Sequence, residues 1–297
     1  MAEHSHAHGG HSHSDALSHG HGHGHSHGHA HGHAHGHAHD FWDGAAYLSR
    51  PGVQETASIN AANLESALSA LSHIHTDFKP SNFPNLSLIE VGAGPGAVTA
   101  HLAPVFGTVY ATELSANMLS AFAAQPVAQR PNVSYGLVGL GPGSKADFEG
   151  GKAFPAPTEA EPDRTAAPPV KSFDVAAVNL VLHHVDDVHA FMEGVKGVLR
   201  PGGAVIITEF TLAEDGTDVV AKNRAMKAER EHNAAAEATG SVNAPGHHHD
   251  TFSLESIQKM LTHFGFTHVG AARGPMLPVF GPDMDPVPGM YAYGLAP

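Results

Sequence analysis

An apolar run that ends in a glycine-rich turn, LIEVGAGPG, occupies Leu88–Gly96. This pattern predicts a buried strand that runs into a tight bend. Glycines suit the bend because they accept positive φ and let a ligand lie against the backbone. A second apolar run, Val109–Thr112, leads to the carboxylate of Glu113, at the spacing of about twenty residues with which nucleotide-binding α/β folds hold ribose hydroxyls. The two segments together predict a site for an adenosine-containing cofactor.

The glycine loop by itself leaves the type of cofactor open. Gly92, Gly94 and Ala97 satisfy the dinucleotide pattern G-x-G-x-x-G/A, whereas Gly92, Gly94 and Gly96 satisfy a G-x-G-x-G pattern. A structural turn without any ligand is a third interpretation. Glu113 likewise has a structural alternative, as a negative charge at the start of the next helix.

Alternating apolar and amphipathic segments predict the elements that position these residues. Strands are expected at Leu86–Val91, Thr108–Glu113, Val133–Leu137, Phe173–Val178, Ala204–Phe210, Thr267–Ala272 and Met290–Leu295. Helices are expected at Gln54–Leu71, Ala97–Ala103, Ala116–Ala123, Asp187–Leu199, Thr217–Ala238 and Leu254–Phe264. Strand–helix alternation of this kind predicts an α/β fold with a mainly parallel sheet and helices on both faces.

Composition excludes several classes of function. The chain has 297 residues and no cysteine, so disulfides, thiolate metal sites and cysteine nucleophiles are ruled out. A formal net charge of −14 argues against a nucleic-acid partner. The sequence shows no secretory signal and no apolar run long enough to span a membrane. We therefore expect a cytoplasmic protein, with a nuclear location left open.

Composition also changes abruptly near residue 40. Of the 28 histidines, 16 precede Asp40, mostly alternating with Gly, Ala or Ser. A segment with so little to bury is predicted to be a disordered tail, residues 1–40, followed by one globular domain, residues 41–297. Within that domain, residues 139–171 are rich in Gly, Pro and acidic residues and are expected to form an inserted flexible loop.

Five segments in order resemble the motifs of class I S-adenosylmethionine-dependent methyltransferases, in particular of the members that act on small molecules. The similar segments are Leu88–Gly96, Ala111–Leu119, Phe173–Asp187, Val198–Phe210 and His247–Val269. The resemblance covers most of the globular part, from about Leu86 to Leu295. It implies a Rossmann-like, doubly wound sheet of seven strands that is mainly parallel, with one antiparallel strand.

The resemblance also implies roles for individual residues toward S-adenosylmethionine. Glu90 would reach the amino group of the cofactor and Glu113 both ribose hydroxyls, a task that suits a carboxylate because it offers two acceptor oxygens. Asn179 and Leu180 would lie near the reacting methyl group. The whole set of implied cofactor contacts is Glu90, Gly92, Ala93, Gly94, Gly96, Glu113, Leu114, Asn179 and Leu180. The acidic residue that family members usually carry after the third strand is missing, so the adenine contact is not assigned.

The acceptor is expected to be a small molecule, methylated by in-line displacement at the sulfonium. The segment NLVL at the end of the fourth predicted strand differs from the (N/D)-P-P-Y type that acts on nucleobase and glutamine nitrogens. A base is needed only where the acceptor is protonated, and His183 and His184 are the candidates because imidazole titrates in the useful range. Either histidine alternatively packs structurally or caps a helix.

The histidine-rich tail suggests metal binding, because neutral imidazole is a good ligand for zinc, nickel and copper. The candidate ligands are His21, His23, His25, His27, His29 and His31. His247, His248 and His249 would either close the acceptor side or form a local metal site. Two other functions stay open: a metal-buffering protein with an inactive methyltransferase-like domain, and an NAD-dependent oxidoreductase. A low-complexity tail without any function is the simplest alternative.

Overall fold

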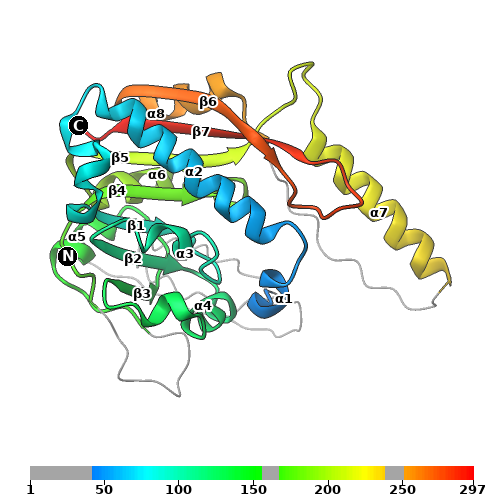
Figure 1. Ribbon diagram of the computed structural model, residues 1–297, viewed down its shortest axis with the longest axis horizontal. Coiled ribbons are helices and arrows are strands. Elements are labelled where there is room, and N and C mark those ends of the chain that lie inside the picture. The colour runs from blue at the N-terminus through cyan, green and yellow to red at the C-terminus, as the bar shows by residue number, and fades with distance from the viewer. Residues whose placement is uncertain (1–41, 156–166, 238–250) are drawn as a thin grey trace, which may run out of the picture. The chain divides into compact units, whose positions relative to one another are not determined.

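The computed structural model describes residues 42–155, 167–237 and 251–297, which form one seven-stranded sheet with flanking helices (Figure 1). The strands are β1 (Ser87–Val91), β2 (Thr108–Glu113), β3 (Val133–Leu137), β4 (Phe173–Asn179), β5 (Leu199–Phe210), β6 (Thr267–Leu277) and β7 (Val287–Leu295). Their order is β3-β2-β1-β4-β5-β7-β6. Strand β7 pairs antiparallel with β5 and β6, and the other pairs are parallel. The predicted fold class is confirmed.

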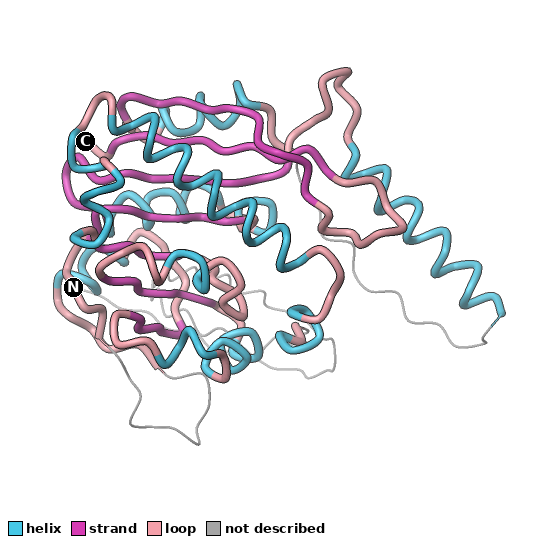
Figure 2. The backbone as a smooth tube through the Cα atoms, viewed as in Figure 1, coloured by secondary structure: helices cyan, strands magenta, loops and turns pink. Residues whose placement is uncertain are grey.

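Helices connect most of the strands, as the tube in Figure 2 shows. The α-helices are α1 (Gly44–Leu48), α2 (Val53–Ser72), α3 (Thr99–Leu102), α4 (Ala116–Ala123), α5 (Ser144–Glu149), α6 (Val188–Val198), α7 (Val219–Glu237) and α8 (Leu254–His263). Short 3-10 turns are η1 (Thr76–Phe78), η2 (Pro80–Asn85), η3 (Pro126–Gln129) and η5 (Leu182–His184). Helices α1, α4, α6, α7 and α8 begin after a side chain that accepts a hydrogen bond from the first turn, as N-cap residues do. These side chains are Asp43, Ser115, Asp187, Asp218 and Ser253.

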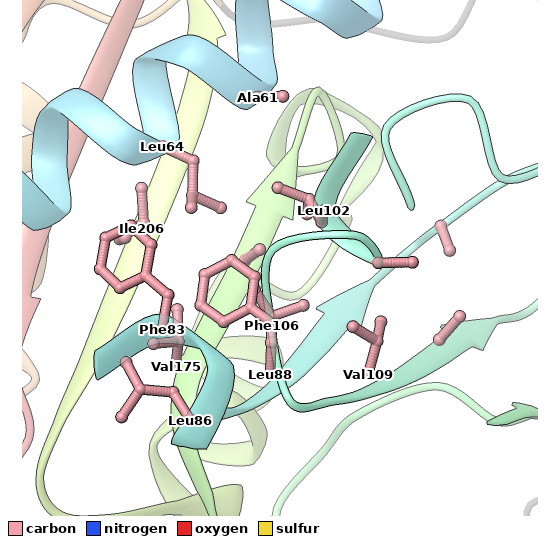
Figure 3. Packing of buried hydrophobic residues seen from close by; sticks show 14 of the residues in the cluster. Ala61, Leu64, Phe83, Leu86, Leu88, Leu102, Phe106, Val109, Val175 and Ile206 are labelled. Atoms are coloured by element: carbon pink, nitrogen blue, oxygen red, sulfur yellow. The ribbon is translucent and has the colours of Figure 1, made fainter. Parts of the chain in front are cut away.

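The core lies on both faces of the sheet because successive side chains of a strand point to opposite sides. On one face, Leu88 of β1 and Ile206 of β5 pack in a cluster with Leu64 of α2 (Figure 3). On the other face, Ile207 of β5 packs in a second cluster with Met192 of α6. The sequences of central strands that are covered on both sides are continuous apolar runs. The positions of these strands could therefore be predicted well from the sequence.

The predicted loop at 139–171 was wrong over Ser144–Glu149, which forms helix α5. Phe148 of this helix and Phe154 after it are buried against the α6 face of the sheet. The many Gly and Pro residues around these two aromatic anchors concealed the short helix. Residues 156–166 lie outside the described residues, as does the tail before Trp42, so the domain boundary near residue 40 stays a prediction.

The chain order of the strands reverses between β1 and β4. From β1 the chain moves outward to β2 and β3, and it then returns to β4 and continues to β5 on the other side. In open α/β sheets the ends of two such strands diverge, and ligands bind in the crevice beyond their carboxyl ends. The fold therefore directs attention to the residues that follow β1 and β4.

Candidate functional site

The loop after β1 is built on three glycines with positive φ, namely Gly92 (69°), Gly94 (56°) and Gly96 (86°). A Cβ on Gly92 would lie 2.5 Å from Cγ2 of Val181, and one on Gly96 would lie 2.7 Å from Cδ2 of Phe122. These two glycines are thus required by packing as well as by φ. Around Gly94, in contrast, no atom of the described residues other than its two neighbours in the chain lies within 4 Å of such a Cβ. The middle of the loop is where a ligand has room to approach the backbone.

Glu113 ends β2 and holds the glycine loop against the start of α4. Its Oε2 accepts a hydrogen bond from the Gly94 N–H (2.8 Å), and its Oε1 accepts from the N–H groups of Leu114 (2.7 Å) and Ser115 (2.9 Å). The loop is fixed to β2 a second time, because the Ala93 N–H donates to the carbonyl of Thr112 (2.9 Å). Glu113 therefore has the helix-start role that was considered as an alternative, and it also contacts the loop.

Glu90 of β1 is buried beneath the loop among neutral hydrogen-bonding groups. Thr99 Oγ1 donates to its Oε2 (2.6 Å), and Asn179 Nδ2 donates to its Oε1 (3.4 Å). Asn179 accepts in turn from Thr208 Oγ1 (3.0 Å). Burial raises the pKa of Glu90 to about 7, against the lowering effect of the two hydrogen bonds, and the nearby negative charge of Glu113 adds to the rise.

A histidine and a glutamate form a buried pair on the other side of β4. His183 lies in η5, just after β4, and its Nδ1 is 2.9 Å and 3.0 Å from the two carboxylate oxygens of Glu209 on β5. Glu209 also accepts from the N–H groups of His183 (3.3 Å) and Phe210 (3.1 Å). The carboxylate thus fixes the ring and its backbone together. The ring of Phe210 lies 4.9 Å from the His183 ring, between centroids.

Leu180 joins Asn179 to this histidine turn in an uncommon backbone conformation. Its φ is +53°, a value that side chains with a Cβ rarely adopt. The Leu180 N–H donates to the carbonyl of Thr208 (2.9 Å) and so anchors the bend to β5. Outliers of this kind gather at functional sites, where the surrounding structure holds them in place.

His184 points to a different neighbourhood from His183. Its ring centroid lies 4.1 Å from that of His183. The ring of its other neighbour, Trp42, packs edge-on against His184 with 5.7 Å between centroids. Trp42 in turn contacts Tyr47 of α1, at 6.4 Å between centroids. The segment before α2 therefore contacts the histidine turn through Trp42 and His184, whereas the Nδ1 contact with Glu209 is made by His183.

The structure thus gathers the predicted residues of the globular domain at the carboxyl ends of β1, β2 and β4. It also adds residues that the sequence analysis missed, chiefly Glu209, Thr99 and Thr208. A signal for Glu209 was present, because it is the only charged residue in the apolar run AVIITEF and buried charges almost always have partners. The tail histidines and His247–His249 lie outside the described residues.

Comparisons with known proteins identify the family. A family model described as a methyltransferase domain matches residues 63–271, well over half of the chain. The chain belongs to this methyltransferase family. It is a class I S-adenosylmethionine-dependent methyltransferase. The NAD alternative left open by the glycine motif is set aside by this match.

Individual relatives are distant from this methyltransferase. The reducing polyketide synthase Preu2 of Preussia isomera is 29% identical over 129 residues, which are 43% of this chain and only 5% of that synthase. A putative methyltransferase from Bacillus halodurans C-125 is 16% identical, with a TM-score of 0.46 over 78% of this chain and 99% of the other. Magnesium protoporphyrin IX methyltransferase from Synechocystis PCC 6803, with bound SAH, is 14% identical, with a TM-score of 0.43 over 78% and 84%.

The residues of this methyltransferase fit the cofactor of its family. Gly94 has the open space and the positive φ that close approach of a ligand requires. The buried carboxyl group of Glu90 and the half-buried one of Glu113 lie close to the loop. Within residues 42–155, 167–237 and 251–297, no group of three His, Asp or Glu side chains is arranged to hold a metal ion. In the same parts of the chain, no helix is both long and apolar enough to cross a membrane.

Proposed function

We propose that this methyltransferase acts on a small-molecule acceptor whose nucleophile bears a proton, with His183 as the base. The observation that carries the proposal is the buried contact of His183 Nδ1 with the Glu209 carboxylate, 2.9 Å long. Asn179 and Leu180, the residues expected near the reacting methyl group, lie immediately before this turn. A base is thus held next to the point at which methyl transfer is expected.

The pairing determines what the imidazole can do. When neutral His183 carries its proton on Nδ1, facing Glu209, its Nε2 holds the lone pair that accepts a proton from the acceptor. The Glu209 carboxylate then stabilises the imidazolium that forms and keeps the ring in one orientation. General bases held in this way contribute about 10²- to 10⁴-fold to a rate.

The cofactor would be held mainly by the first half of the sheet. We propose that Glu113 accepts from the ribose hydroxyls, that Glu90 lies near the amino group, and that the backbone of Gly92–Gly96 lines the methionine part. Leu114, 70% exposed beside Gly139, offers an apolar surface to the adenine ring. When bound, S-adenosylmethionine supplies an electrophilic methyl group, and the protein aligns the two reactants and excludes water.

Transfer of tritiated methyl groups tests the proposal. The purified protein is incubated with labelled S-adenosylmethionine and a cell extract, which is then separated into small molecules, protein and nucleic acid. We expect label among the small molecules, and much less of it when His183→Gln protein is used. Label confined to protein or nucleic acid would contradict the proposed acceptor class.

Two further proposals concern the histidine-rich tail, which lies outside the described residues, and the location of the protein in the cell. We propose that the tail histidines, from His21 to His31, bind zinc, nickel or copper, and that the protein is cytoplasmic. Titration of Zn²⁺ into the full chain and into a chain that begins at Phe41 tests the first of these. Equal binding by the two chains would contradict a role of the tail.

A further inference from the structure

Helix α2 carries a row of three buried polar side chains, each with one polar atom that has no hydrogen-bond partner among the described residues. The exposed fractions of Thr56, Asn60 and Asn63 are 4%, 1% and 3%. Thr56 Oγ1, Asn60 Oδ1 and Asn63 Nδ2 find no partner among the described residues. Positions four and three residues apart lie on one side of a helix, so the three groups form one row. At about 1.5 Å per residue, the row is about 10 Å long.

The neighbours of the row place its first half beside the functional site. On one side of it, Ala57 packs in a cluster with Ala97, at the end of the glycine loop. On the other side, Ile59 packs in a cluster with Leu180 and Phe210. At about 100° per residue, Thr56 and Asn60 lie on the helix surface between Ala57 and Ile59, and so between these two clusters. They therefore look toward the region between the glycine loop and the histidine turn.

The second half of the row runs toward β6. A Cβ on Gly274 would lie 2.7 Å from Asn63 Nδ2, so the absence of a side chain at this glycine makes room for the amide. The amide still has no partner for its Nδ2. A buried polar atom without a partner destabilises the fold, and an apolar side chain of the same shape would remove that cost. Three such atoms in a row call for a reason other than stability.

We propose that Thr56, Asn60 and Asn63 bind the acceptor through its uncharged polar groups, such as hydroxyl or carbonyl oxygens. The row offers a hydroxyl, an amide oxygen and an amide nitrogen, which are matched by neutral donors and acceptors. It contains no charged side chain, and the clusters on both sides are apolar, so a carboxylate or phosphate would be desolvated without a partner. The inference rests on the proposed function and names the class of its substrate: a neutral molecule with an apolar body.

The first test uses stability, which requires no acceptor. Asn60→Leu removes a polar atom without a partner, and its melting temperature is expected to equal or exceed that of the wild type. Asn132→Leu is the matched control, because Asn132 Nδ2 donates to the carbonyls of Ala103 (2.8 Å) and Phe106 (2.9 Å), and this variant should melt at a lower temperature. A loss of stability in Asn60→Leu as large as in the control would show a structural role and overturn the inference.

The second test uses two pairs of acceptors that differ in charge. The pairs are 4-hydroxyacetophenone with 4-hydroxybenzoate, and acetylacetone with acetoacetate, each assayed with tritiated S-adenosylmethionine. We expect the wild type to prefer the neutral member, and Asn60→Leu to raise KM for it about tenfold, the loss of about 1.4 kcal/mol of binding, while the Kd for S-adenosylhomocysteine stays the same.

Three results would overturn the inference: preference for the charged members, an unchanged KM in Asn60→Leu, or no transfer to either neutral compound by a protein that binds S-adenosylhomocysteine. A wild-type protein that does not bind S-adenosylhomocysteine would instead contradict the cofactor site of the proposed function.

Discussion

Glu90 and Glu209 are both buried on central strands, but their surroundings differ. Glu90, beneath the glycine loop, is contacted by the neutral side chains of Thr99 and Asn179. Glu209, on the acceptor side, is contacted by the ring of His183 and by two backbone N–H groups. Among the described residues, the carboxyl group of Glu90 has neutral hydrogen-bond partners, whereas that of Glu209 faces a group that becomes a cation when it takes up a proton.

Burial alone therefore does not define the role of an acidic residue. Among neutral partners, desolvation raises the pKa of Glu90 to about 7, so the group titrates near neutral pH and suits a cationic ligand. Against an imidazole, a carboxylate instead orients the ring and stabilises its charged form. The two halves of the site are thus prepared for different tasks before any ligand binds.

The largest expected effect is at the acceptor half. His183→Gln removes the proposed base and should lower kcat for methyl transfer by about 10²- to 10⁴-fold, while the Kd for S-adenosylhomocysteine, measured by calorimetry, stays the same. His184→Gln is the matched control, since the contact with the Glu209 carboxylate is made by His183, and the neighbouring ring of His184 packs edge-on against Trp42. Equal losses in the two variants would contradict a special role for His183.

A pH series of unfolding measurements tests the cofactor half. The pKa of Glu90 rises from 4.5 to about 7 on folding, so the folded state keeps the proton longer and the free energy of unfolding should fall as pH rises from 4.5 to 7. Above pH 7 this contribution is constant. Over the whole window it amounts to about 3 kcal/mol, at about 1.4 kcal/mol per pKa unit.

Glu90→Gln isolates this contribution, because the amide cannot titrate. We measure the free energy of unfolding of both proteins with denaturant at several pH values. The value for the wild type minus that for Glu90→Gln should fall between pH 4.5 and 7. The same slope in Glu90→Gln and the wild type would assign the pH dependence to other groups and remove the contrast with Glu209.

A smaller effect is expected for Glu113. Glu113→Ala should weaken binding of S-adenosylmethionine by about 1.5–3 kcal/mol if charge-assisted hydrogen bonds to the ribose are lost. Glu113 also accepts a hydrogen bond from the Gly94 N–H, so its loss could disturb the loop itself. Glu113→Gln serves as the control because it keeps one acceptor oxygen for this hydrogen bond. Calorimetry that finds wild-type affinity in Glu113→Ala would exclude the ribose role.

The smallest effect concerns the two glycines of the loop. Gly94→Ala meets open space and is strained only by its positive φ, so it should lower the free energy of unfolding by about 1 kcal/mol. In Gly92→Ala the backbone is strained in the same way, and the new Cβ also clashes with the side chain of Val181. This variant should therefore lower the free energy of unfolding by more than Gly94→Ala does. Thermal unfolding of the two variants side by side checks the order, and a reversed order would mean that the loop is packed differently.

The sequence predicted the elements well where local pattern decides them. Helix α4 and strands β2 and β3 have the predicted bounds, because apolar runs and the N-cap Ser115 mark their limits. It failed at α5, where two buried aromatic residues fix a helix that Gly and Pro around it conceal. It also ended β6 too early and began β7 too late, since the missed parts of these two strands are held by pairing with each other.

The glycine loop, its acidic partner on the next strand and the order of strands and helices could be predicted from the sequence alone, because they depend on φ preferences and on the periodicity of apolar residues. The contact of His183 with Glu209, 26 residues further along the chain, arises only when the chain is folded. That meeting follows from the parallel pairing of β4 with β5, in which Asn179 lies opposite Thr208. The row on α2 was equally hidden, because a polar residue on a helix reveals its burial only once the helix is packed.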